Sequence, residues 1–215
     1  MILLLIREAN MMRFWAFLSA LFLMATPVNA LEKDAQKIQQ VENYLNNVTT
    51  LKASFVQTAS NGSTAEGKIY IEKPNKIRME YNEPTNVLIV GDGDNIIYND
   101  KDLDQVTNID YEDVPASLVL ANNVKIDGKQ IAVSNYYEDA GSVVVKLKYP
   151  SKPEIMPITL TFTTKPFALR QWSIVDPQSV EVIVSLYDVE TDIALDKELF
   201  KFKKAKSPMK YKGKK

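Results

Sequence analysis

Hydrophobic and polar positions change their period near residue 50 of the chain. Before that point, apolar residues recur at spacings of three and four in residues 31–48; they are Ile38, Val41, Leu45 and Val48. This spacing places them on one face of a helix, with polar side chains on the opposite face. The pattern therefore predicts one amphipathic helix at the start of the folded part.

After residue 50 the apolar side chains alternate with polar ones at every second position, which is typical of strands with one buried face. Ile77, Met79 and Tyr81 share one face of residues 75–81, with charged residues between them. Residues 86–90 are continuously apolar, which predicts a strand covered on both faces. Strands are predicted at 51–59, 68–72, 75–81, 86–90, 95–98, 103–107, 130–136, 142–149, 158–164, 169–175 and 180–187.

One short helix interrupts these strands at residues 114–121. Pro115 suits the first position of a helix, and Asp113 is a candidate cap. Turn residues at 91–94, 138–141 and 176–179 predict tight connections between strands. Residues 193–203 are predicted to form a loop or a single turn that ends in the apolar residues around Phe200.

These elements predict a fold that is mainly β with few helices. About ten or eleven strands with tight turns favour one strongly curved antiparallel sheet, a half-open β-barrel, because a sheet of that width must curl. Two helices are too small to fill the concave face of such a sheet. We therefore expect an apolar cavity covered by a helical lid.

Residues 1–30 have the pattern of a secretory signal peptide. Arg13 precedes the apolar run 14–24, and small residues lead to a cleavage site after Ala30. Met11 and Met12 are alternative true starts. No cysteine follows the apolar run, so we expect an exported mature protein without a lipid anchor. An uncleaved membrane anchor is the alternative, and the folded domain is expected at 31–203.

Charge is unevenly distributed along the chain. Residues 201–215 contain eight lysines and no acid, whereas residues 31–200 contain 16 basic and 26 acidic residues. We expect residues 204–215 to be a disordered lysine-rich tail that increases solubility, or that attracts anionic lipid head groups or an acidic partner. The acidic body argues against a nucleic-acid partner.

Histidine and cysteine are both absent from the chain. Most catalytic triads and zinc sites need one of them, so binding is favoured over catalysis and no catalytic residue or cofactor is predicted. Asp92 with Asp94, and Asp100 with Asp102 and Asp104, show alternate oxygen ligands. Their spacing lacks the glycine and the final glutamate of a calcium loop, so turn chemistry is the preferred interpretation and no metal site is predicted.

Six short segments occur in an order that resembles a known family. They are Ser54-Phe55-Val56-Gln57, residues 67–74 and 78–84, Asp92-Gly93, Tyr98-Asn99 and Gln105-Val106-Thr107. This ordered set is similar to the LolA family, the periplasmic carriers of outer-membrane lipoproteins, and the similarity covers nearly the whole mature chain.

The resemblance implies a half-open barrel, closed by helices, that binds the acyl chains of a lipoprotein on its concave face. It also implies loading from an inner-membrane lipoprotein-releasing ABC transporter and delivery to an outer-membrane acceptor lipoprotein. The expected location is the periplasm, and we expect a monomer.

The resemblance also singles out Lys73, which stands where family members usually carry an arginine that bonds the lid-helix backbone. Lysine lacks the planar fork of arginine, so the latch is expected to be weaker. The residues expected to line the acyl-chain cavity could equally form plain sheet core. They are Phe55, Ile77, Met79, Tyr81, Leu118, Val119, Leu120, Leu160, Phe162 and Trp172.

Two alternatives from other classes stay open at this point. An envelope-stress sensor, or another lipid-binding module of the same fold, would share the curled sheet, and a sensor is expected to need a second domain. A carbohydrate-active enzyme would need a close pair of carboxylates in the cavity, at least one with a raised pKa.

Overall fold

The computed structural model describes residues 28–203 of the 215-residue chain. The predicted lysine-rich tail and all but residues 28–30 of the predicted signal peptide lie outside the described residues. The chain divides into two units after Ala35, and the second unit contains every described strand. None of the described helices is both long enough and apolar enough to cross a lipid bilayer.

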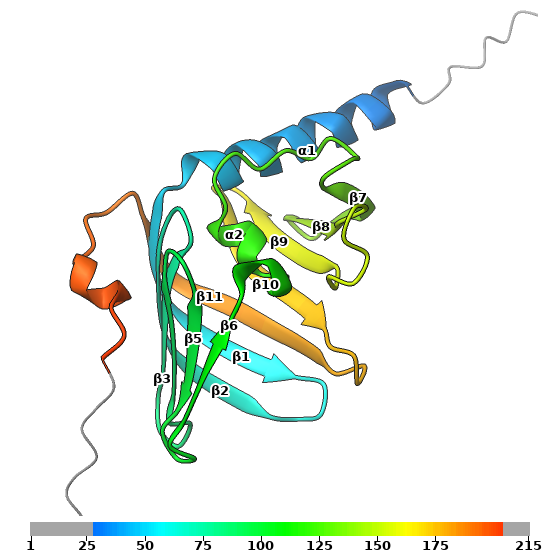
Figure 1. Ribbon diagram of the computed structural model, residues 1–215. Coiled ribbons are helices and arrows are strands. Elements are labelled where there is room, and N and C mark those ends of the chain that lie inside the picture. The colour runs from blue at the N-terminus through cyan, green and yellow to red at the C-terminus, as the bar shows by residue number, and fades with distance from the viewer. Residues whose placement is uncertain (1–27, 204–215) are drawn as a thin grey trace, which may run out of the picture. The chain divides into compact units, whose positions relative to one another are not determined.

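The elements follow the predicted order, with one helix before the strands and short helical turns after the sixth strand and at the end (Figure 1). The helices are α1 (Val28–Asn47), the 3₁₀ turn η1 (Tyr111–Asp113), α2 (Ser117–Leu120) and the 3₁₀ turn η2 (Lys197–Phe200). The strands are β1 (Thr50–Ala59), β2 (Thr64–Glu72), β3 (Lys76–Tyr81), β4 (Val87–Asp92), β5 (Ile96–Asp100), β6 (Gln105–Ile109), β7 (Ala132–Asp139), β8 (Ser142–Lys148), β9 (Ile158–Thr164), β10 (Phe167–Val175) and β11 (Glu181–Thr191).

All of the described strands join one antiparallel sheet of eleven strands, which confirms the predicted fold class. Their order is β6-β5-β4-β3-β2-β1-β11-β10-β9-β8-β7, so the first and last strands are paired at the centre. The chain between β6 and β7 must therefore pass from one edge of the sheet to the other. This crossover carries η1 and α2 over the concave face, as Figure 1 shows.

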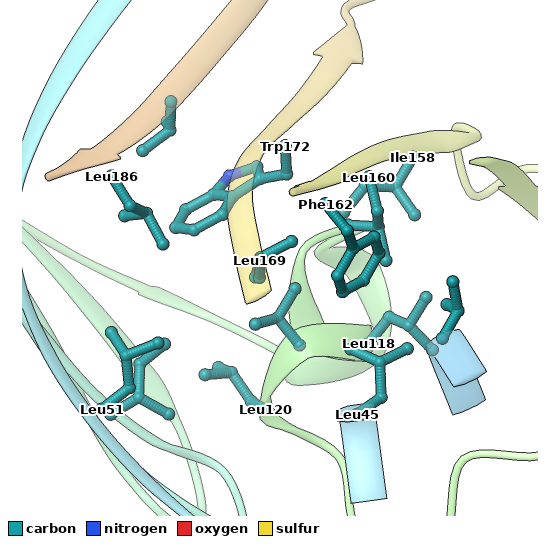
Figure 2. Close-up of a cluster of buried hydrophobic side chains, with 14 of the residues drawn as sticks. Leu45, Leu51, Leu118, Leu120, Ile158, Leu160, Phe162, Leu169, Trp172 and Leu186 are labelled. Carbon is teal, nitrogen blue, oxygen red and sulfur yellow. The ribbon is translucent and has the colours of Figure 1, made fainter. Parts of the chain in front are cut away.

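The core lies on the concave face, beneath the second part of α1 and beneath α2. Val41 and Leu45 of α1 and Leu118 of α2 are buried against strand residues such as Leu160 and Phe162. Figure 2 shows Leu45, Leu118, Leu160 and Phe162 gathered in this cluster. Each buried side chain of this size contributes roughly 1.5–3 kcal/mol relative to exposure, so this cluster holds both helices on the sheet.

The η2 segment packs on the convex face, against β3 and β4. Phe200 of η2 is buried there, and Arg78 of β3 donates a hydrogen bond to the Leu199 carbonyl at 3.1 Å. The Lys76 ammonium lies 5.9 Å from the centre of the Phe200 ring. Val90 of β4 pairs with Arg78 and is fully buried. The C-terminal segment thus covers the convex face of β4, which explains why residues 86–90 are continuously apolar.

Candidate functional site

An apolar cavity of about 200 Å³ lies between the concave face and the crossover that carries α2. It opens among strands from both halves of the sheet, with α2 at one end. Apart from Gln57, the hydroxyls of two tyrosines and the indole nitrogen of Trp172, the side chains that line it are hydrocarbon or thioether in character. They are Gln57, Ile71, Ile77, Met79, Tyr81, Ile89, Ile96, Tyr98, Ile109, Val114, Ala116, Val119, Leu120, Trp172, Ile174, Val182 and Val184.

The alternation of β3 supplies one wall of the cavity. Ile77 and Met79 point to the concave face, where they pair with Gly91 and Ile89 of β4. Gly91 leaves room for the crossover, because a Cβ atom there would lie 2.3 Å from the Tyr111 hydroxyl oxygen and 2.9 Å from Cγ2 of Ile77. The missing side chain of Gly91 thus lets the start of the crossover approach the sheet.

Six of the ten predicted cavity residues lie along this cavity, namely Ile77, Met79, Tyr81, Val119, Leu120 and Trp172. The other four, Phe55, Leu118, Leu160 and Phe162, are buried in the packed core and are absent from the lining. Phe162 shows why. Tyr44 of α1 meets its ring edge-on at a centroid distance of 5.4 Å, and Phe167 stacks on it at 5.0 Å, so α1 fills the space above β9.

Sequence reasoning missed most of the lining from β4, β5, β10 and β11. These residues belong to the same concave rows as the predicted ones, because Ile89 pairs with both Met79 and Tyr98 and Val184 pairs with both Gln57 and Trp172. Alternation within each strand indicated which of its residues share the concave face. The pairing register, which the sequence does not reveal, was needed to combine the strands into one wall.

The polar side chains of the lining lie in the part of the cavity away from α2, which the apolar residues Ile174 and Val182 also line. The Tyr81 hydroxyl donates a hydrogen bond of 2.8 Å to Oε1 of Gln57. The Tyr81 ring meets Phe55 edge-on at 5.0 Å, across Gly67, which pairs with both residues. Burial, and then the proximity of Tyr98, raises the pKa of Tyr81 to about 12, so its hydroxyl stays protonated at neutral pH.

The crossover is attached to the sheet on both sides of α2. On the β3 side, the backbone amide of Asn75 donates to the Leu120 carbonyl at 3.0 Å, and the Tyr111 hydroxyl donates to the backbone carbonyl of Asn75. On the β8 side, the Tyr149 hydroxyl donates to the Pro115 carbonyl at 3.2 Å. These contacts hold α2 over the cavity without a direct ion pair to the helix itself.

The segment after α2 is attached to α1 by two polar side chains. The amide of Asn46 donates to the Val124 carbonyl at 2.9 Å and accepts from the Val124 amide at 2.7 Å. A carboxylate oxygen of Glu42 accepts from the Ile126 amide at 2.7 Å. The position of α1 therefore influences the position of the crossover.

Lys73 is half-buried, and its ammonium donates a hydrogen bond to the Leu45 carbonyl near the end of α1. The resemblance implied a bond to the backbone of the lid helix, whereas the partner in the structure belongs to α1. Carbonyls in the last turn of a helix lack partners within the helix, and the negative end of the helix dipole attracts a cation. Desolvation by burial lowers the pKa of Lys73 to about 8.

The aspartate-rich turns form local hydrogen bonds that explain their composition. The Asp92 carboxylate accepts from the amides of Asp94 and Asn95, and Asp100 does the same for Asp102 and Leu103. These backbone bonds, chiefly that from Asn95, lower the pKa of Asp92. Turn chemistry therefore accounts for both sites. Among the described residues, no three metal-binding side chains of the Asp, Glu, His or Cys type gather in one place.

Comparison with known proteins gives a consistent result. A family model described as "Outer membrane lipoprotein carrier protein LolA" matches residues 46–203. The outer-membrane lipoprotein carrier protein of Pseudomonas aeruginosa is 25% identical over 195 residues, which cover 86% of this chain and 91% of that protein. The corresponding protein of Nitrosospira multiformis is 37% identical over 98 residues, 41% of this chain and about half (47%) of its relative's length.

Among solved structures, a LolA superfamily protein from Nitrosomonas europaea is 7% identical, with a TM-score of 0.47 over 78% of this chain and 97% of that one. The family match extends from the end of α1 to the segment after η2, and so includes every described strand. The chain therefore belongs to the LolA family, whose members are periplasmic lipoprotein carriers rather than enzymes.

Proposed function

We propose that this protein binds the acyl chains of lipoproteins in the cavity beneath α2 and carries them through the periplasm. In this proposal the inner-membrane lipoprotein-releasing ABC transporter loads the carrier, and an acceptor lipoprotein of the outer membrane receives the cargo. Residues 1–30 act as the export signal, cleaved after Ala30, and the carrier domain extends from 31 to 203. The apolar cavity between the concave face and α2 is the observation that carries the proposal.

The chemistry of the lining suits a hydrocarbon ligand. Each buried methylene contributes about 0.8 kcal/mol, so one long acyl chain gives on the order of 10 kcal/mol before the costs of binding. That is enough to keep a lipid chain out of water, but it would make unaided release slow. A carrier consequently needs an interaction that competes with its cargo.

Closure of α2 over the cavity supplies such a competitor. The cavity of about 200 Å³ is smaller than the ~300–1,000 Å³ of typical ligand pockets, so a lipoprotein's acyl chains require α2 to move outward. Opening breaks the contacts of Asn75, Tyr111 and Tyr149 with the crossover. These contacts favour the closed state. Only the open fraction of the protein can bind cargo, so the apparent affinity is the intrinsic affinity multiplied by that fraction.

In this scheme Lys73 acts on the lid through α1. Its hydrogen bond to the Leu45 carbonyl fixes the last turn of the helix. Asn46 in that turn and Glu42 in the turn before it hold the segment after α2. Removing the ammonium loosens this support and shifts the equilibrium toward the open, cargo-bound state. The substitution Lys73→Leu is therefore expected to retain cargo.

The lining also bears on the alternatives. No Asp or Glu is among the residues that line the cavity, so it offers no carboxylate pair for glycoside hydrolysis. The strongly apolar wall favours lipid over carbohydrate. A sensor built on the same cavity is distinguished by its cargo, because a sensor is not expected to carry intact lipoproteins.

Mass spectrometry of the protein purified from its native cell envelope tests the proposal. We expect triacylated protein to co-purify with the wild type and in greater amount with Lys73→Leu, which should also hand it over more slowly to the acceptor. Failure of acylated protein to co-purify with either form would refute the carrier function. Equal hand-over rates for both forms would refute only the role of Lys73.

A further inference from the structure

The polar side chains of the cavity are confined to the part of its lining away from α2, and this asymmetry suggests how a ligand is oriented. Its α2 end is formed by apolar side chains such as Val119 and Leu120, whereas Gln57, Tyr81 and Tyr98 bring polar atoms to the other part of the lining. Ile77 lies near the α2 end, close to Asn75, which holds Leu120. Tyr81 lies four residues further along β3, about 13 Å away at the usual rise of a strand.

We propose that Gln57, Tyr81 and Tyr98 form a polar subsite for the ester and amide groups at the head of bound acyl chains, with the chain ends directed toward α2. The inference rests on the proposed function, since it concerns the same cavity and the same class of ligand. It adds the direction in which the lipid enters and the residues that recognise its polar linkage.

The hydrogen bond between Tyr81 and Gln57 leaves both kinds of polar group available to a ligand. The Tyr81 hydroxyl uses its proton in the bond to Oε1 of Gln57, so its oxygen can still accept. The same bond orients the Gln57 amide and leaves its NH₂ group to donate. The carbonyl of an acyl ester or amide can accept from the Gln57 NH₂ group. The N–H of an amide can donate to the Tyr81 oxygen, so the ligand and the two side chains are complementary.

Phe55 and Gly67 hold the Tyr81 ring, and so its bond to Gln57, in position. Phe55 packs edge-on against the Tyr81 ring at 5.0 Å over Gly67. A side chain at Gly67 would bring its Cβ atom within 1.9 Å of the Glu80 carbonyl oxygen, so only glycine permits this arrangement. Such support reduces the entropy that Tyr81 loses when it binds a polar group.

The test compares two ligands of similar length, N-methylpalmitamide and octadecane, in displacement of a fluorescent apolar dye from the purified protein. Gln57→Leu and Tyr81→Phe should each weaken binding of the amide about fivefold, equivalent to about 1 kcal/mol or one net hydrogen bond. Their affinity for octadecane should stay the same or increase. Tyr81→Phe keeps the ring against Phe55, so it remains informative if Gln57→Leu does not fold.

Matched controls lie on the convex face of the same sheet. Gln171→Leu and Tyr187→Phe make the same chemical changes at positions that do not line the cavity, and they should alter neither affinity. Equal weakening of both ligands by the cavity variants, or no change in either, would overturn the subsite. A wild-type protein that binds neither ligand would defeat the proposed function as well, and it would do so before any variant is made.

Discussion

The burial of Lys73 makes a quantitative prediction about stability and pH. Its ammonium is half-buried, and among the described residues its side chain has one hydrogen-bond partner, the Leu45 carbonyl, and no ion pair. Burial lowers its pKa from 10.5 to about 8. The folded protein therefore holds this proton less tightly than the unfolded chain does, and folding becomes more favourable as the pH rises from about 8 to 10.5.

The size of the effect follows from the two pKa values. One pKa unit corresponds to about 1.4 kcal/mol, so the wild type should gain about 2 to 3 kcal/mol of unfolding free energy between pH 7 and pH 10 from this group. Below pH 7 the contribution is constant, because Lys73 is protonated in both states. The variant Lys73→Met lacks the titrating group and should not show this gain.

Urea unfolding of the wild type and of Lys73→Met at several pH values between 7 and 10 measures the difference directly. Other groups titrate in both proteins, so their effects cancel in the comparison. Lys73→Arg is the matched control, since arginine stays charged over this range and should track the Met variant. Wild-type and Met curves that stay parallel within ~0.5 kcal/mol would refute the burial of a charged Lys73.

Three further perturbations test other parts of the structure. Tyr111→Phe removes the hydroxyl that bonds the Asn75 carbonyl, which should weaken the closed state. We expect an acyl-chain probe to bind up to about tenfold more tightly in fluorescence titration. Unchanged or weaker binding would contradict the competition between lid closure and cargo. Gly91→Ala places a Cβ atom 2.3 Å from the Tyr111 hydroxyl oxygen, so hydrogen exchange of the Asn75 and Leu120 region should accelerate, and unaltered protection would argue against this packing. Phe200→Ala removes the ring that η2 buries on the convex face and should lower the unfolding free energy by ~3–5 kcal/mol in urea without changing probe affinity. A changed affinity would mean that the η2 segment acts on the cavity.

Local sequence patterns were enough to predict the fold class and the wall of the cavity that β3 supplies. Alternation in residues 75–81 assigned Ile77, Met79 and Tyr81 to one face, and all three line the cavity. Period-two patterns are local, because successive side chains of a strand point to opposite faces whatever lies beyond them. The turn residues were readable for the same reason, and Asp92 bonds the backbone of its own turn.

Two features depend on the tertiary structure: which buried residues line the cavity, and which carbonyl Lys73 binds. Phe162 and Trp172 belong to strands with the same alternation, yet Tyr44 of α1 packs on Phe162 while Trp172 borders the cavity. Alternation reports that a face is buried but not what covers it, and the covering element here lies more than 100 residues away in sequence. Lys73 likewise binds the end of α1 because folding brings the unpaired Leu45 carbonyl to it, which no local pattern encodes.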